Sequence, residues 1–277
     1  ISHPSIPEYS VHDLSYIGKS PDKLRNLIEQ GIYHIHDIED ASNLTDKQRN
    51  QVLVHKSDTE MIDKQEIENV LNSYTYPLYF FDYETYAPAV PIYDGFFPYQ
   101  RIPIQFSLHV IDKKGGQVRH VEYLQTENVD PSETVAKMLE ENIEPGGTVL
   151  AWNVGFEKSV TAELALRLPE YENVQTRICG QMQDLMDIFS NQHYVHKGFK
   201  GRVAIEAVMN TLLPDMTYDH LPYTGADVGH VWWSDIVNQG KEPKERDGKL
   251  HLLLEYCKQD TFVMVEIFRV LNEIILK

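Results

Sequence analysis

The stretch that decides the fold begins with Tyr76-Pro77-Leu78-Tyr79-Phe80-Phe81 and continues directly into Asp82-Tyr83-Glu84-Thr85. Its first six residues are almost all aromatic or aliphatic, which predicts a buried β-strand that ends at the acidic pair. Side chains alternate between the two faces of a strand, so Asp82 and Glu84 share one face. Neighbouring carboxylates repel each other and raise each other's pKa unless a cation lies between them. Acids are also common at solvated strand ends, but this pair emerges from a core strand.

The segments after this strand predict a mixed sheet. Residues 104–110 alternate with period two, a glycine turn lies at 114–116, and residues 118–124 return as a third strand. Further elements are a helix at 130–141, a strand at 148–152, a helix at 156–168 and one long helix over the last 30 residues. This order resembles an RNase H-like plan. We expect an α/β fold: an RNase H-like mixed sheet of three antiparallel strands plus parallel strands, flanked by helices.

The first 73 residues are more polar than the rest and predict short helices near residues 21–30, 46–54 and 64–71. We expect residues 1–73 to form a small helical N-terminal region or a connector from a preceding domain. Residues 74–277 would form the RNase H-like domain. The chain begins with Ile1 rather than methionine, so we expect it to be a fragment of a longer protein.

Two further polar pairs follow predicted elements. Asn153 and Glu157 come after the strand at 148–152, and their ordinary interpretation is a helix cap and an acid in the first helical turn. Tyr256 and Asp260 lie one turn apart on the last helix, so they share a face. Either pair alone is common by chance. Their order is more informative, because they follow a carboxylate pair on the first strand of the sheet.

These three segments resemble the motifs of a nuclease superfamily. Residues 81–85 look like the first exonuclease motif of the DEDD 3′–5′ exonucleases, residues 153–157 like the second, and residues 256–260 like the third in its tyrosine form, DEDDy. The resemblance runs from about residue 76 to the C-terminus. It is closest to an uncharacterised bacterial family, domain of unknown function 2779. The second motif normally ends in Asp, where this chain has Glu157. Asp184 or Asp187 could supply the fourth acid instead, although their spacing also fits a capping or surface role.

The resemblance implies hydrolysis of phosphodiester bonds with two divalent cations, Mg²⁺ or Mn²⁺. The implied ligands are Asp82, Glu84, Glu157 and Asp260, whose oxygens are the hard ligands that these ions prefer. Asp82 would contact both ions, Glu84 and Asp260 would hold the first, and Glu157 would act on the second through water. Tyr256 would orient the attacking water. The sequence contains no HExxH segment, and its paired histidines have no cysteine partners, so a soft-metal site is not indicated.

Substrate contacts are expected from the motifs and from one basic stretch. The resemblance assigns Thr85 of the first motif and Asn153 of the second to substrate binding. Residues 196–202 are basic, glycine-rich and aromatic, and they precede a helix predicted from residue 203. Phosphates could meet loop amides, the helix N-terminus and cations there. The cations concerned are Lys197, Lys200 and Arg202. An exposed basic loop without function is the competing interpretation.

Composition narrows the class of protein. A hydrophobic content of 42% permits a sizeable core and excludes wholesale disorder. The sequence has no run of about 20 apolar residues, no secretory signal and only two cysteines, so we expect a cytoplasmic protein without membrane contact. The net charge of −17 argues against passive coating of duplex DNA. It does not argue against an enzyme that meets phosphates through bound cations.

The expected function is therefore a metal-dependent 3′–5′ exonuclease of DNA or RNA, with a single-stranded 3′ end as partner. Members of the family that the sequence resembles often follow a RecB- or Cas4-like nuclease domain, so such a domain in the same full-length chain is a further expected partner. The alternative is a catalytically weak or inactive RNase H-like module that binds nucleic acid or a partner, which Glu157 and the acidic surface favour. A structure-specific endonuclease that uses the same acids is a third possibility.

Overall fold

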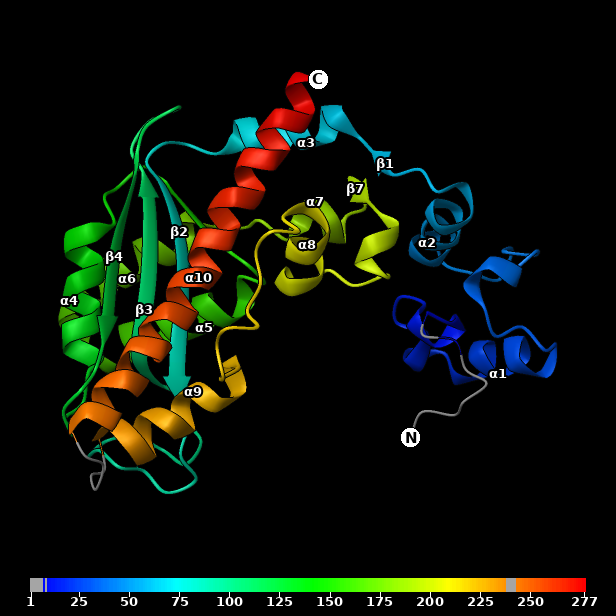
Figure 1. Cartoon of the computed structure of the whole chain (residues 1–277). Coiled ribbons are helices and arrows are strands. Elements are labelled where there is room, and N and C mark those ends of the chain that lie inside the picture. Colours follow the sequence, from blue (N-terminus) through cyan, green and yellow to red (C-terminus); the bar gives the residue numbers. More distant parts are fainter. Residues whose placement is uncertain (1–6, 8, 238–242) are drawn as a thin grey trace. The chain divides into compact units, whose positions relative to one another are not determined.

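The structure, a computed structural model, describes residues 7, 9–237 and 243–277 (Figure 1). The chain divides into two compact units. The first unit contains the residues up to Leu71, together with Met186–Met216 and Val270–Lys277. The second unit contains Asn72–Leu185 and Thr217–Arg269.

A five-stranded mixed sheet forms the centre of the second unit. Its strands are β2 (Leu78–Tyr86), β3 (Ile102–Ile111), β4 (Val118–Leu124), β5 (Thr148–Ala151) and β6 (Met182–Asp184). They lie in the order β4-β3-β2-β5-β6. The first three are antiparallel, whereas β5 and β6 run parallel to β2. The predicted α/β fold with a mixed sheet is confirmed at this level.

The strand that carries the acidic pair is longer than expected. We predicted that Asp82 and Glu84 end the strand, but β2 continues to Tyr86. The reason is that β3 pairs with β2 along this whole length. The pairing of β5 with β2 stops at Phe80, so the acids lie in a part of β2 that is paired on one edge only.

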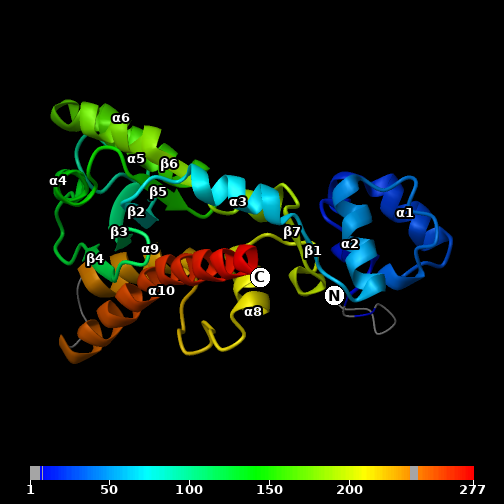
Figure 2. The same ribbon diagram turned by 90° about the horizontal axis from the view of Figure 1, so that it is seen from above.

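One face of the sheet is covered by helices and is apolar. Alternate residues of β2, namely Tyr79, Phe81 and Tyr83, form one core with apolar residues of α4 (Ser132–Asn142), α5 (Gly155–Arg167) and α6 (Glu172–Gln181). A short turn, η4 (Pro169–Tyr171), joins α5 to α6. Figures 1 and 2 show these helices on one side of the sheet and α10 (Pro243–Leu276) on the other. The long final helix is therefore present as predicted.

The face toward α10 carries buried polar residues. Ser107 and His109 of β3 both hydrogen-bond to Thr261 Oγ1 of α10, at 2.7 and 2.8 Å. Ser107 is also the register partner of Asp82 on β2. Buried hydroxyls and imidazoles need such partners, so these bonds fix where α10 crosses the sheet. They place the residue before Thr261, which is Asp260, opposite the acidic segment of β2.

A second core closes the other end of the same unit. It joins the start of β3 to α9 (Gly225–Val231), to the π-helical turn η6 (Trp232–Val237) and to α10. Trp232 is fully buried, and its Nε1 donates to the carbonyl of Gln125 at 2.7 Å. The helix α9 lies close to the end of β2, because Gly229 has no side chain. A Cβ at Gly229 would lie 2.8 Å from the carbonyl oxygen of Thr85.

Short helices make up most of the first unit. They are η1 (Val11–Asp13), η2 (Ile17–Lys19), α1 (Pro21–Glu29), η3 (Ile35–Asp37), α2 (Asp46–Ser57), most of α3 (Lys64–Ser73), α7 (Asp187–Ser190), η5 (Lys197–Phe199) and α8 (Ile205–Leu212). The two-residue strands β1 (Met61–Ile62) and β7 (Tyr194–Val195) pair antiparallel. Ser15 Oγ also donates to the Gly201 carbonyl at 2.7 Å. These contacts join residues 186–216 to the N-terminal region, so the expected division after residue 73 differs from the observed units.

Candidate active site

Three carboxylates converge between β2 and α10. Asp82 and Glu84 come from β2, and Asp260 comes from α10. One ligand oxygen from each of the three lies within 4.8 Å of the others. The resemblance implied that these three acids share one site, and the structure brings their oxygens together. Among the residues that the structure describes, no other three His, Cys, Asp or Glu side chains are grouped in this way.

A β-bulge adjoins the acidic pair. The register of β2 against β3 shifts between Glu84 and Thr85. Bulges of this kind change the direction of neighbouring side chains and are frequent beside active sites. Thr85, a predicted substrate-binding residue, lies directly after the bulge and is partly buried. Thr85 therefore follows Glu84 directly on the strand that carries two of the three acids.

Burial and mutual repulsion dominate the electrostatics of this group. Burial raises the pKa of Asp82 well above its usual range, and the charges of Asp260, Glu84 and Glu157 raise it further. The pKa of Glu84 is raised by burial and then by Asp260 and Glu157. In the part of the chain that the structure describes, no Lys or Arg opposes these shifts. Buried like charges of this kind require a proton or a cation between them.

Glu157 lies beside the three acids. It stands in the first turn of α5 and is only 3% exposed. Its Oε2 is buried and has no hydrogen-bond partner among the described residues. Burial, followed by the charge of Asp184, raises the pKa of Glu157 to about 7. Its charge acts on both Asp82 and Glu84, although its oxygens are outside the group that lies within 4.8 Å.

Two tyrosines adjoin Asp260. Burial, followed by the charges of Asp260 and Glu84, raises the pKa of Tyr256 above its usual value. A side chain at Gly225 would lie 3.3 Å from the Tyr256 hydroxyl, so α9 begins directly beside that group. The second residue is Tyr218, whose hydroxyl donates to Asp260 Oδ1 at 2.5 Å. The two rings are 5.9 Å apart.

Tyr218 could not be recognised from the sequence. It lies in an irregular segment, 42 residues before Asp260 along the chain, so neither helical nor strand spacing connects the two.

Cys257 is a second residue of the site that the sequence did not point to. Its thiol lies 3.5 Å from Asp82 Oδ2, and burial raises its pKa well above the usual value. A protonated thiol in this place packs against the carboxylate without adding a charge.

Asp184 and Asp187, the alternative candidates for the fourth acid, both accept hydrogen bonds near the start of a helix. The carboxylate of Asp184 accepts hydrogen bonds from the backbone amides of Asn153 and Val154, both at 3.0 Å. It therefore caps the start of α5 from the end of β6, in agreement with the capping interpretation. Asp187 lies in the first unit and accepts from Ser190 Oγ at 3.2 Å. Neither belongs to the group of three acids.

Asn153 is not the helix cap that its position suggested. The capping position of α5 is Val154, and Asn153 has a left-handed backbone with φ of 67°. Asparagine tolerates this conformation better than most residues. Its side chain is exposed, so it remains open to solvent near the start of α5.

The predicted basic stretch belongs to the first unit. Lys197 forms an ion pair with Asp58, and Lys200 has a left-handed backbone. Arg202 lines a pocket of this unit. The following helix, α8, begins at Ile205 rather than at residue 203. The first unit therefore carries all three of the cations that were predicted to meet substrate.

The fold and site define an α/β protein with a largely buried carboxylate group, Asp82 and Asp260 being partly exposed, on one face of a mixed sheet. Residues 79–204 match the model of a family described as domain of unknown function (DUF2779), which supports the family predicted from the sequence. The matched segment includes Asp82, Glu84 and Glu157 but ends before Tyr256 and Asp260. No curated protein and no solved structure matched the chain. None of the described helices combines the length and apolar character that a membrane crossing requires.

Proposed function

We propose that the chain is a metal-dependent 3′–5′ exonuclease of the DEDDy type with an RNase H-like fold. The observation that carries the proposal is the convergence of Asp82, Glu84 and Asp260 within 4.8 Å. The sheet supports the fold assignment, because three antiparallel strands are followed by two strands parallel to the first. The order of the three motif segments along the chain supports the superfamily assignment.

The side chains present fit divalent cations. The donors are carboxylate oxygens, which Mg²⁺ and Mn²⁺ prefer over other protein ligands. The raised pKa values of Asp82 and Glu84 and the unpartnered Oε2 of Glu157 are the expected signs of a site that gains stability from positive charge. Bound ions would lower the pKa of a water molecule and offset the negative charge of the phosphate.

The residues of the chain have distinct tasks in this proposal. Asp82, Glu84 and Asp260 would hold the cations, and the buried Glu157 would contribute the fourth negative charge. Tyr256 has a raised pKa, so its hydroxyl stays protonated and orients water by hydrogen bonding rather than removing a proton. Thr85 and Asn153 remain the proposed contacts to the substrate strand.

The test is cleavage of single-stranded DNA and RNA that carry a label at the 5′ end, with Mg²⁺ or Mn²⁺ present. We expect products that shorten one nucleotide at a time from the 3′ end, while a circular single strand stays intact. Asp82→Asn should remain folded and lose cleavage by roughly 10²-fold or more, because a charged ligand is lost. Near-normal cleavage by folded Asp82→Asn would contradict the assignment. Cleavage of the circle would indicate an endonuclease instead.

A second candidate is a non-catalytic module that binds nucleic acid or a partner. The position of Glu157 favours it, because this acid is outside the group of three carboxylates among the described residues. A longer side chain in place of the usual Asp moves the ligand oxygen. Strand binding without cleavage by the metal-loaded wild-type protein would support this candidate over the exonuclease.

A further inference from the structure

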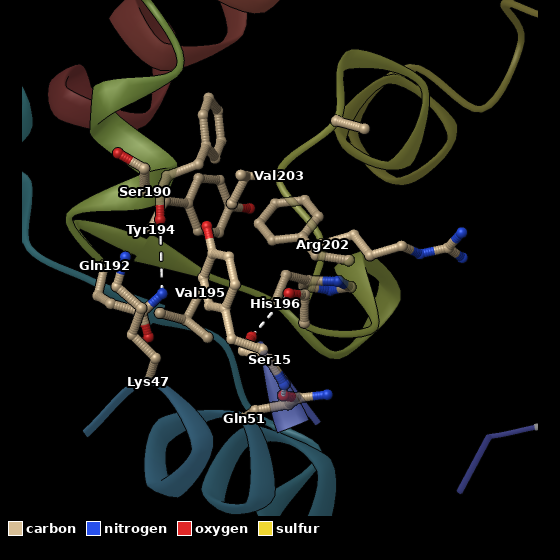
Figure 3. Close-up of a pocket in the computed structure, with 15 residues that line it drawn as sticks. Ser15, Lys47, Gln51, Ser190, Gln192, Tyr194, Val195, His196, Arg202 and Val203 are labelled. Atoms are coloured by element: carbon tan, nitrogen blue, oxygen red, sulfur yellow. Dashed lines mark hydrogen bonds between the residues drawn. The ribbon is translucent and has the colours of Figure 1, made fainter. Parts of the chain in front are cut away.

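A pocket of about 320 Å³ lies within the first unit. Figure 3 shows that two distant segments form it: Ser15, Lys47 and Gln51 come from the N-terminal part, and Tyr194, His196 and Arg202 come from residues 186–216. This volume is at the lower end of the range for sites that hold small organic ligands. The pocket is thus of a size for one compact molecule or one unit of a chain.

The charge of the pocket is opposite to that of the protein. Its 15 lining residues include Lys47, His196 and Arg202 but no Asp or Glu. The chain has 42 acidic residues among 277, so an even distribution would place about two in such a set. The Arg202 guanidinium has no ion pair or hydrogen bond to a described residue. A pocket that excludes acids in a protein of net charge −17 is complementary to an anion.

Hydrogen bonds fix the polar side chains that line the pocket. Gln51 accepts from the Ser15 amide at 2.9 Å and donates to Tyr9 Oη and the Asp13 carbonyl, both at 2.9 Å. Gly201 has φ of 70°, and a Cβ there would lie 2.5 Å from the Gln51 amide group. The two segments therefore meet at a point where only glycine fits. His196 Nδ1 accepts from the Gly198 amide at 3.0 Å, which leaves Nε2 as the donor.

An exposed aromatic ring stands at the rim. Tyr16 is 62% exposed, and its backbone has φ of 56°, a left-handed conformation that is unusual for a large residue. Such strain is concentrated at functional sites. The ammonium groups of Lys19 and Lys47 lie 4.9 and 6.0 Å from the centre of this ring. An aromatic face and two cations are thus brought together.

A second hollow adjoins the pocket. The two hollows share Ser15, Tyr16, Lys47, Ser190 and Gln192. The second hollow adds Lys19 and one acid, Asp46, which is already paired with Arg49. The combined groove therefore extends from Arg202 past Tyr16 to Lys19, with cations at intervals.

We propose that this groove binds a single-stranded nucleic acid, with one nucleotide seated in the pocket. A base would stack on the Tyr16 ring, and successive phosphates would meet Lys19, Lys47 and Arg202. A free nucleotide would use only the pocket, whereas the second cationic hollow fits the next phosphate of a strand. The inference extends the proposed function by adding a strand-binding site in the first unit. It rests on the residues of that unit alone and not on the carboxylate group.

The test is fluorescence anisotropy of the whole chain with a labelled 12-nucleotide single strand, DNA or RNA, in EDTA. We expect Lys47→Ala combined with Arg202→Ala to raise Kd tenfold or more and to reduce the salt slope by about 0.7 for each lost phosphate contact. Tyr16→Ala should weaken binding by roughly 5- to 100-fold through lost stacking. Matched controls are Lys64→Ala and Tyr33→Ala, which lie outside the groove and should bind as the wild type does.

Each outcome of the binding experiment either supports or overturns the inference. Circular dichroism establishes that each variant is folded. Unchanged binding by the folded groove variants, or no binding by the wild type, would overturn the inference. Competition by a nucleoside monophosphate as effective as that by the unlabelled strand would also overturn it, because the occupant would then be a free nucleotide. EDTA removes divalent ions, so the outcome does not depend on whether the carboxylate group supports cleavage.

Discussion

Asp82 illustrates how one position can combine burial with charge. It lies on the core strand β2 and faces α10, next to three other acids, and burial is the largest cause of its raised pKa. The arrangement is unfavourable for a bare carboxylate and favourable for one that binds a cation. The same reasoning applies to Glu157, whose buried Oε2 has no partner in the described part of the chain. Ionisable side chains that are buried away from water, and whose pKa values are shifted as a result, are typical of functional sites.

The two tyrosines beside Asp260 lead to different predictions. Tyr218 donates to Asp260 Oδ1, so Tyr218→Phe removes a bond that orients a proposed ligand. We expect it to weaken apparent Mn²⁺ affinity by about 10- to 100-fold, as is usual for groups that orient metal ligands. Tyr256→Phe should keep metal affinity and lower the rate at saturating metal by roughly 10²-fold. Cleavage rates measured over a range of Mn²⁺ concentrations separate the two effects.

The contrast between the two variants is the critical result. If Tyr218→Phe cleaved normally at low metal concentration, its bond to Asp260 would have no role in metal binding. If Tyr256→Phe lost metal affinity instead of rate, the role assigned to its hydroxyl would be wrong. Removal of one hydroxyl leaves each ring to pack as before, so unfolding is not the expected effect of either change.

At the scale of elements, close contact between α9 and β2 depends on Gly229. A Cβ there would lie 2.8 Å from the Thr85 carbonyl and 3.2 Å from the Tyr86 ring. Gly229→Ala must therefore displace α9 and should lower the free energy of unfolding by about 1–3 kcal/mol. Gly180→Ala is the matched control, because Gly180 lies in α6 and a Cβ added to it would have no atom within 4 Å outside its chain neighbours and the nearby helix backbone. It should raise the free energy of unfolding by up to about 1 kcal/mol. Urea unfolding of both variants measures the difference, and equal effects would contradict the close contact.

The contact between β3, β4 and α10 contains two stacked histidines, His109 and His120, with ring centres 4.2 Å apart. Burial lowers the pKa of His109 to about 3, helped by His120 and Lys258. Burial and then Lys258 lower the pKa of His120 to about 4. Glu122 lies 4.0 Å from His120 Nε2, at the limit for an ion pair, whereas Ser107 Oγ is closer at 2.9 Å. Burial therefore outweighs Glu122, and the pKa of His120 is lowered.

This pair predicts a loss of stability in acid. Both histidines are neutral in the folded state, whereas the unfolded chain takes up protons below about pH 6.5. Their contribution is complete above that pH and is lost as the pH falls toward 4 and then 3. His120→Gln keeps a polar partner for Ser107 but cannot be protonated. Between pH 6 and 5, the unfolding free energy of the variant should fall less steeply than that of the wild type, by up to about 1.4 kcal/mol per pH unit. Parallel curves would contradict a neutral His120.

At the scale of the whole molecule, local sequence patterns predicted the helices and strands. Contacts between residues far apart in the sequence determine how these elements assemble, and local patterns did not predict them. Hydrophobic periodicity and aromatic runs were sufficient to predict the main strands and helices of the second unit, because each of these signals lies within about ten residues of sequence. The acids on β2 and α10 could be brought together only through the resemblance to known motifs. Tyr218 and the capping role of Asp184 arise from irregular segments and from backbone amides, which leave no period in the sequence.

The composition of the two units was the least predictable feature. Residues 186–216 were assigned to the sheet domain, but the β1–β7 pairing and the bond from Ser15 to Gly201 place them with the N-terminal region. Pairing of two-residue strands carries almost no sequence signal. The same contacts bring together the two segments that form the basic groove. The basic residues of the groove could therefore be recognised in the sequence, but the pocket that they line could not.

The central claim is that Asp82, Glu84 and Asp260 hold divalent cations, and Mn²⁺ titration followed by electron paramagnetic resonance of the free ion tests it most directly. At pH 7.5 we expect two Mn²⁺ ions per chain for the wild type. Asp82→Asn should bind fewer ions or bind them roughly tenfold more weakly. Asp187→Asn is the matched control and should bind as the wild type does, because Asp187 lies in the first unit and accepts from Ser190. Absence of Mn²⁺ binding by the wild type, or equal binding by the wild type and Asp82→Asn, would contradict the account.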